Sequence, residues 1–372
     1  MKDLPLSRRQ MVEIAKALAR QPKILILDEA TSALTASDVN KVFEVLKRLR
    51  AEGLPLLYIS HRMHEIAELA DECTVFRNGR RISTFAAGTK RDAEVIELMI
   101  GREYKHAFPE KPVRKADGRP PALQCKGLGW SDRLKDISFS LDAGEIIGLG
   151  GLDGQGQREL LLALFGVLRD CRGDILIDGE RVKIESPVAA KSDRIGLALI
   201  PEDRKTEGLM LPMSVRDNLS VAAFDRFAPF GVIDRQRQSS LIDEMIRLIE
   251  IKTASPDIAV SALSGGNQQK VVIAKWLMNR PRIILLNDPT RGIDVGTKQE
   301  IYRLLRRLAD QGAAILLYST DYDELIGCCD RVLVMYDGAV RRELAGHEIT
   351  ERALVSSALN VDDGEAAEAS LG

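Results

Sequence analysis

Two acidic residues follow a short apolar run near the start of the chain, and their order suits phosphate chemistry. Asp28 and Glu29 come directly after residues 24–27. In such a pair the first carboxylate can bind Mg²⁺ and the second can polarise an attacking water. His61 follows the next apolar run, where an imidazole could meet a γ-phosphate. Taken alone, the acids could be a solvated loop and the histidine a structural residue.

A glycine-rich loop stands between residues 145–150 and a helical pattern, with glycines at Gly151, Gly154 and Gly156. In the pattern GxxxxGK[ST], backbone N–H groups and the helix dipole bind phosphate, Lys reaches the β and γ oxygens, and Ser or Thr holds Mg²⁺. Here Gln157 replaces the Lys and Arg158 replaces the hydroxyl. The loop therefore predicts a backbone cradle without its cation and metal ligand, or a plain strand-to-helix turn.

A second predicted anion site opens a helix further along the chain. Its six residues combine a serine hydroxyl with glycine amides at the positive end of the helix dipole. These residues are Leu263, Ser264, Gly265, Gly266, Asn267 and Gln268.

Residues 263–294 repeat residues 4–35 at an offset of 259 positions, with identities at 11 of 32 positions. A repeat of this length predicts a duplicated domain rather than a short stacked unit. The copies differ where chemistry is expected, because Asn287 and Asp288 replace the Asp-Glu pair and Thr320 replaces the histidine. Asn is a poorer metal partner, and Asp is one methylene too short to position the water. We therefore expect two unlike sites.

Each copy reads as a helix, a proline stop and a buried strand that ends in polar residues. The helices are expected at residues 10–19 and 269–278, and the strands at 24–27 and 283–286. Continuous apolar strands are typical of a parallel sheet that is covered on both faces. Open α/β sheets bind ligands at the carboxyl ends of their strands, so the sequence predicts an α/β fold with its site at that edge.

The repeat also predicts the domain organisation. Residues 1–100 are expected to form the C-terminal part of a first domain, 101–121 a polar linker, 122–360 a complete second domain and 361–372 a disordered tail. Projecting the second domain onto the first places about 136 residues, including a first strand and phosphate loop, ahead of Met1. A truncated domain, a mis-set start or a degraded gene would each explain this.

The composition excludes several classes of protein. Lys and Arg number 53 and Asp and Glu 55, so the formal net charge is −2 and no bulk basic footprint for nucleic acid is present. The five cysteines lack metal or disulfide spacing and are expected to pack in the interior. No apolar run approaches the roughly 20 residues of a membrane span. Any membrane association is therefore expected to occur through a partner.

Taken together, these motifs resemble the ABC ATPases. The resemblance rests on LSGGNQQ, on the strand ends DEAT and NDPT, and on the histidine after the next strand. The segments PEDRKTEGL at 201–209 and DPTRGIDVGTK at 288–298 are similar to those of bacterial monosaccharide importers. This resemblance implies a P-loop NTPase (ABC ATPase) fold that is tandemly duplicated, with its first copy incomplete.

The resemblance further implies that ATP and Mg²⁺ bind between head-to-tail domains. One site would combine the metal ligand Asp28 and the catalytic Glu29 and His61 with residues 263–268. The other would join Gly151, Gly154, Gly156, Gln157, Arg158, Asn287 and Asp288 with the altered residues 4–10. We expect this second site to bind nucleotide weakly at most and not to hydrolyse it.

The implied partners are the membrane permease subunits, which residues 203–209 and the following helices would face, and indirectly a periplasmic sugar-binding protein. The implied location is the cytoplasmic face of the bacterial inner membrane, as a peripheral subunit. The alternatives are a nucleoside importer ATPase, an inactive gene fragment of such a subunit, or a soluble ABC protein acting on ribosomes or DNA. The last would be expected to carry a basic arm or zinc cysteines, and neither is visible in the sequence.

Overall fold

A computed structural model describes residues 6–28, 30–31, 34, 36–60, 63–77, 79–100, 108–112, 118–228 and 231–360. The chain divides into a smaller unit, Met1–Ala107 with Arg291–Gly296, and a larger unit, Phe108–Thr290 with Thr297–Gly372. Glu29, His61 and the predicted tail lie outside the described residues. Within the described ranges, no helix is long and apolar enough to cross a membrane.

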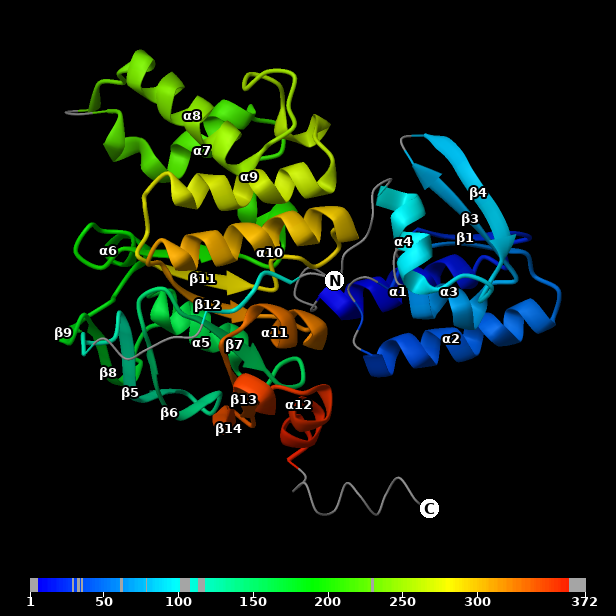
Figure 1. Ribbon diagram of the computed structural model, residues 1–372, viewed down its shortest axis with the longest axis horizontal. Coiled ribbons are helices and arrows are strands. Elements are labelled where there is room, and N and C mark those ends of the chain that lie inside the picture. Colours follow the sequence, from blue (N-terminus) through cyan, green and yellow to red (C-terminus); the bar gives the residue numbers. More distant parts are fainter. Residues whose placement is uncertain are drawn as a thin grey trace. The chain divides into compact units, whose positions relative to one another are not determined.

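The smaller unit contains a parallel strand pair with helices on one face (Figure 1). Strand β1 (Leu25–Asp28) pairs with β2 (Leu56–Ile59), and Phe43 and Leu46 of α2 (Ala36–Ala51) pack in the core beneath them. The remaining described elements are α1 (Leu6–Leu18), α3 (Met63–Leu69), the hairpin β3 (Glu72–Arg77) with β4 (Arg80–Ala86), and α4 (Asp92–Ile100).

The prediction that these strands are covered on both faces is wrong for the smaller unit. Leu25 and Leu27 are buried, but Ile26 is 63% exposed and Leu57 is 53% exposed. The cause is that the strand side chains alternate between faces, and the core of this unit contacts only one of the two.

The larger unit is built on a six-stranded sheet in the order β10-β11-β12-β7-β13-β14. The first five strands are mutually parallel and β14 is antiparallel. The strands are β7 (Ile146–Gly150), β10 (Leu197–Ile200), β11 (Ile283–Asn287), β12 (Ala314–Tyr318), β13 (Arg331–Tyr336) and β14 (Ala339–Ala345). Every residue of β7, β11 and β12 is buried, so the predicted central parallel sheet is confirmed here.

An antiparallel sheet in the order β6-β5-β8-β9 packs onto this parallel sheet through α5 (Gln157–Leu164). Its strands are β5 (Leu123–Trp130), β6 (Leu134–Leu141), β8 (Arg172–Ile177) and β9 (Glu180–Val182). Leu160, Leu161 and Leu164 of α5 join both sheets in one core. Cys125 is buried in that core, and burial raises the pKa of its thiol.

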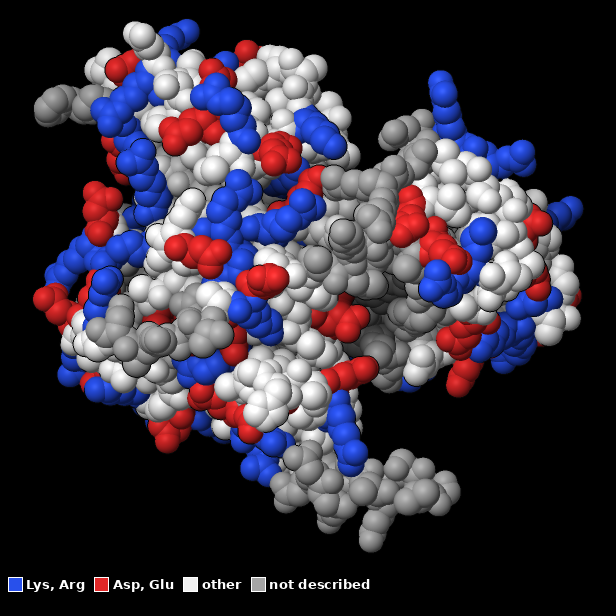
Figure 2. All heavy atoms as spheres, viewed as in Figure 1, with Lys and Arg blue, Asp and Glu red and all other residues white. Residues whose placement is uncertain are grey.

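A helical layer lies above the parallel sheet in Figure 1 and contains α7, α8 and α9. These helices are α7 (Val215–Ser220), α8 (Arg235–Ile249) and α9 (Gly265–Leu277). The other helices of the unit are α6 (Pro187–Ala190), α10 (Val295–Asp310), α11 (Tyr322–Cys328) and α12 (Glu351–Ala358). On the face shown in Figure 2, cationic and anionic side chains are interspersed over this layer.

Candidate nucleotide-binding site

The sheet order brings most of the predicted residues of the larger unit to one edge. Strand β12 lies between β7 and β11, and all three are parallel. The glycine loop after β7, Asn287 and Asp288 at the end of β11, and Thr320 after β12 therefore share the carboxyl edge of the sheet. This is the edge at which open α/β sheets bind their ligands.

Two glycines of the loop are required by close approach of the backbone. At Gly151, φ is 120°, and a Cβ would collide with the carbonyl oxygen of Met335. At Gly156, φ is 106°, and a Cβ would lie 2.9 Å from the carbonyl oxygen of Arg133. The loop is thus shaped as the sequence predicts, with Gly156 capping the amino end of α5.

Gln157 fills this loop from within. Its side chain is buried, and its Nε2 donates to the carbonyl oxygens of Gly150 at 3.2 Å and Leu152 at 3.0 Å. Its Oε1 accepts a hydrogen bond of 3.1 Å from the backbone N–H of Gln155. A loop amide that could bind phosphate is therefore already engaged by an internal acceptor.

Arg158 points away from the position that a metal-binding hydroxyl would occupy. Its Nη2 lies 2.9 Å from Oε1 of Glu207, in the π-helical turn Arg204–Gly208. Both side chains are nearly half exposed, so the pair contributes little to stability. The geometry leaves Mg²⁺ without a hydroxyl ligand from the loop.

Tyr318 links the end of β12 to the glycine loop, a contact that the sequence pattern did not reveal. Its hydroxyl donates to Oδ1 of Asp153 at 3.1 Å. Burial raises the pKa of Tyr318 first, and the carboxylates of Asp153, Asp288 and Glu202 raise it further. These three carboxylates thus lie near the Tyr318 hydroxyl, and their negative charge at this edge disfavours a polyanion.

Asn287 and Asp288 are both buried at this edge. Oδ1 of Asn287 is buried and has no hydrogen-bond partner among the described residues, so it could accept a hydrogen bond from a ligand or water. Oδ2 of Asp288 accepts from Oγ1 of Thr320 at 2.7 Å. Across the described ranges, no three His, Cys, Asp or Glu side chains are arranged to hold a metal ion. Arg158 stands at the hydroxyl position of the loop and Asn287 at the first carboxylate position, so the larger unit lacks both side chains that the pattern assigns to Mg²⁺.

The segment 263–268 forms the predicted helix start, in the helical layer rather than at the sheet edge. Ser264 caps α9, where its Oγ accepts from Asn267 Nδ2 at 2.9 Å. Gly266 is required by packing, because a Cβ would meet the side chain of Thr297. Gln268 lies buried and donates to the carbonyl oxygen of Leu263 at 3.1 Å. Ser264 is exposed at the amino end of this 13-residue helix, and the guanidinium of Arg204 lies against Gly265, where a Cβ would be 2.9 Å from Nη2.

In the smaller unit, Asp28 ends β1 and is exposed, as a residue that binds a ligand at a strand end must be. Glu29 and His61 lie outside the described residues, so their predicted roles stay predictions. In the larger unit, Trp130 packs against the core and donates its indole N–H to the carbonyl oxygen of Arg169.

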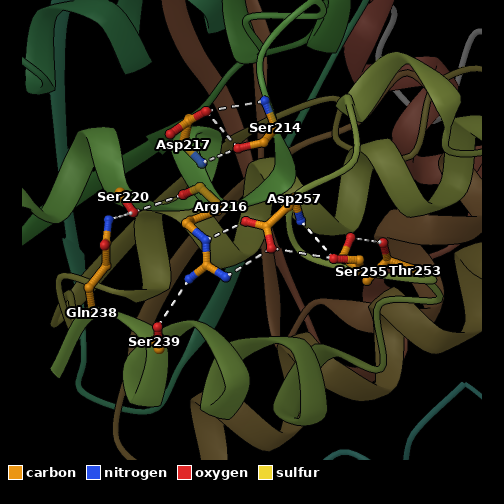
Figure 3. Close-up of polar contacts among 9 residues, drawn as sticks. All are labelled: Ser214, Arg216, Asp217, Ser220, Gln238, Ser239, Thr253, Ser255 and Asp257. Atoms are coloured by element: carbon orange, nitrogen blue, oxygen red, sulfur yellow. Dashed lines mark hydrogen bonds and ion pairs between the residues drawn. The ribbon is translucent and has the colours of Figure 1, made fainter. Parts of the chain in front are cut away.

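A network around Arg216 fixes the helical layer in which segment 263–268 lies (Figure 3). The guanidinium binds Asp257 through two bonds of 2.6 and 3.3 Å and donates to Ser239 of α8 at 3.2 Å. The hydrogen bond to Asp257 raises the pKa of Arg216. Ser214 and Asp217 form a reciprocal cap at the start of α7. The network therefore ties α7, α8 and the loop before α9 together.

Comparisons with known proteins agree with this geometry. Residues 134–291 match the family model described as ABC transporter. A ribose import ATP-binding protein, RbsA 1, from Mesorhizobium japonicum is 71% identical over 372 residues, which cover 100% of this chain and 72% of that protein. The chain belongs to the ABC transporter family. The protein of the same name from Rhizobium johnstonii is 69% identical, with 99% of this chain and 72% of that protein covered.

Among solved structures, the ADP conformation of MJ1267, an ATP-binding cassette of an ABC transporter, matches with a TM-score of 0.53. At 19% identity, and with 68% of this chain and 98% of that chain covered, this likeness shows the fold. The α/β P-loop fold of ABC ATPases is therefore confirmed. The comparisons do not bear out the predicted truncation, and the predicted tandem duplication is not confirmed by them.

Sequence reasoning missed several residues that bond to the loops and strand ends of the candidate site. Tyr318 and Asp153 are 165 positions apart and belong to no recognisable motif. Glu65 and Glu324 are both buried, and each accepts hydrogen bonds from hydroxyl groups that follow two strands. The two glutamates lie 259 positions apart, so a comparison of the two copies of the repeat would have identified them.

Proposed function

We propose that this chain is the ATP-binding and hydrolysing subunit that energises ribose uptake through an ABC importer. The observation that carries the proposal is the identity of 69–71% to ribose import ATP-binding proteins over 97–100% of the chain. Identity this high over almost the whole chain is most simply explained by an activity that this chain shares with those proteins.

The proposed hydrolytic residues are Asp28, Glu29 and His61, and residues 263–268 are proposed to bind phosphate. Asp28 would hold Mg²⁺, Glu29 would polarise the attacking water, and His61 would contact the γ-phosphate. The amino end of α9, capped by the exposed Ser264, would supply backbone donors to the phosphates. Bound Mg²⁺ would neutralise charge that develops on the phosphates.

The second proposed site, at the glycine loop, is not hydrolytic. Gln157 engages the loop internally, Arg158 turns to Glu207, and Asp288 is bonded to Thr320. These contacts support a site that binds nucleotide weakly at most. Among the described residues, Oδ1 of Asn287 is a buried acceptor without a partner that a ligand or water would satisfy.

The proposed partners are the permease subunits at the cytoplasmic face of the inner membrane, and through them a periplasmic sugar-binding protein. Support comes from exposed apolar side chains beside the helical layer, at Val221, Phe224, Val232 and Ile233. Exposed apolar residues that gather on one part of a surface often mark a docking site for another protein.

The test is Mg²⁺-dependent ATP hydrolysis by the protein assembled with its permease, together with uptake of labelled ribose. Glu29→Gln should lower the hydrolysis rate by about 100-fold or more, because amide nitrogen cannot accept the proton of water. Glu44→Gln, on the exposed face of α2, is the control and should hydrolyse ATP normally. Full hydrolysis by Glu29→Gln would overturn the site, and uptake of nucleosides in place of ribose would favour the nucleoside importer.

A further inference from the structure

A buried glutamate in the larger unit collects hydroxyl groups from the ends of two neighbouring strands. Glu324 of α11 is 1% exposed. Its carboxylate accepts from Thr290 Oγ1 at 2.6 and 2.7 Å and from Ser319 Oγ at 2.8 Å. Tyr302 donates its hydroxyl at 2.7 Å, and Lys298 Nζ lies 2.8 Å from Oε1.

The smaller unit contains the same arrangement around Glu65 of α3, which is 0% exposed. Its carboxylate accepts from Thr31 Oγ1 at 2.9 Å, Ser60 Oγ at 2.7 Å and Tyr58 OH at 2.6 Å. Thr, Ser and Glu stand at the same offset of 259 positions in the two units.

The tyrosines, by contrast, do not correspond in sequence. Tyr58 reaches Glu65 from strand β2, whereas Tyr302 reaches Glu324 from helix α10. A phenol therefore arrives at each carboxylate by a different route. Both units thus keep Thr, Ser and Glu at corresponding positions, and each adds a phenol from a different element.

Burying a carboxylate is costly unless hydrogen bonds compensate for the lost water. Hydrogen bonds to a charged group are stronger than those between neutral groups, so the three hydroxyls hold each carboxylate firmly. In the smaller unit, Thr31 follows β1 and Ser60 follows β2, and these strands are parallel neighbours. Glu65 therefore ties together the carboxyl ends of two adjacent strands.

We propose that Glu65 is a positioning residue for ATP hydrolysis, because it anchors the two segments that carry the catalytic residues. Thr31 lies two positions after Glu29, and Ser60 directly precedes His61. Fixing these anchors limits the spread of positions open to the catalytic side chains. The proposal rests on the proposed function. Glu324 anchors the corresponding strand ends of the larger unit, beside Asp288 and Thr320.

The test compares Glu65→Gln with Glu68→Gln in the full-length chain. All three hydroxyls bond to Oε2 of Glu65. Gln keeps the volume of Glu, but its neutral amide oxygen is a weaker acceptor with two lone pairs, so it cannot hold three hydroxyl donors as the carboxylate does. Glu68 lies on the same helix with an exposed ion pair to Lys47, and its substitution is the matched control. Glu65→Gln should lower kcat for ATP by about tenfold or more with KM nearly unchanged, since a misplaced catalytic group affects the chemical step.

Hydrogen exchange provides the second readout, and it does not depend on hydrolysis. Glu65→Gln should speed exchange at residues 30–31 and 58–60, and Glu324→Gln at residues 287–290 and 317–320, each leaving the other unit unchanged. An unchanged kcat, or faster exchange spread evenly over the whole smaller unit, would show that Glu65 only stabilises the fold and would overturn the proposal. Absence of hydrolysis by the unsubstituted protein would instead overturn the proposed function, and the exchange pattern would still decide whether Glu65 anchors the strand ends.

Discussion

Thr320 Oγ1 donates a hydrogen bond of 2.7 Å to Oδ2 of Asp288, at the carboxyl edge of the larger unit. The backbone N–H of Asp288 in turn donates to the carbonyl oxygen of Tyr318 at 2.9 Å. These residues stand where the repeat has Glu29 and His61. A carboxylate that is buried and engaged by a threonine serves as a structural acceptor, so the pair stabilises the edge rather than activating water.

Thr320→Val is therefore expected to destabilise the fold while ATP hydrolysis continues. The buried carboxylate of Asp288 loses one donor, which costs about 1 kcal/mol of unfolding free energy, and up to about 3 kcal/mol if no water replaces it. Urea unfolding measures this. Thr84→Val, at an exposed threonine of β4, should change the free energy of unfolding by less than about 0.5 kcal/mol. If Thr320→Val and Thr84→Val changed the free energy of unfolding equally, the structural role of Thr320 would be contradicted.

The hydrogen bonds that Gln157 makes within the glycine loop predict how MgATP binding responds when the Lys and the hydroxyl of the GxxxxGK[ST] pattern are restored. In the unsubstituted protein, sub-millimolar MgATP should not raise the melting temperature by binding at the glycine loop. The reason is that the backbone N–H of Gln155 is already engaged by Gln157. The double substitution Gln157→Lys with Arg158→Thr restores the cation and the hydroxyl, and should raise the melting temperature with MgATP. Arg158→Thr alone is the control. A shift that is equal in all three proteins would place nucleotide binding elsewhere.

The parts of the fold that were predictable are those with a local signal. The strand predicted at 283–286 is observed as β11 (Ile283–Asn287), because a continuous apolar run is read over a few positions. The glycine loop and the start of α9 were predictable for the same reason, since their function requires particular residue types at fixed spacing.

What the sequence did not reveal depends on contacts between distant segments. Nothing near Gln157 indicates that its amide turns back into the loop, and the bond from Tyr318 to Asp153 exists only because β7 and β12 are neighbours. The exposure of Ile26 depends on which elements cover the sheet, which an apolar run does not encode. The predicted roles of Glu29 and His61 stay predictions.

We expect Lys275 of α9 to make the free energy of unfolding rise at alkaline pH. Its Nζ donates to the carbonyl oxygen of Gly208, and burial lowers its pKa from 10.5 to about 8. Below about pH 8 both the folded and unfolded states hold the proton, and the folded state bears the cost of a buried charge. Between about pH 8 and 10.5 only the unfolded state binds the proton, so the free energy of unfolding rises with pH, by about 3 kcal/mol in all.

Urea unfolding at pH 7, 9 and 10.5 is the measurement for this lysine. Lys275→Met should remove the rise, because the methionine does not titrate. Lys16→Met is the matched control, since Lys16 stands at the same repeat position but is exposed and paired with Glu13. The same pH dependence in Lys275→Met as in the unsubstituted protein would show that another group causes it.

The apolar side chains beside the helical layer predict where the permease binds. Val221 is 51% exposed and Val232 is 72% exposed, so an aspartate at either position remains in water and should change the free energy of unfolding by less than about 1 kcal/mol. At an interface, the same aspartate would be buried without a partner, which is costly, and co-purification with the permease should fall at least about tenfold. Val188→Asp, at a residue of α6 that is 70% exposed, is the control. Permease binding that is unchanged in Val221→Asp and Val232→Asp, or lost equally in Val188→Asp, would place the docking surface elsewhere on the chain.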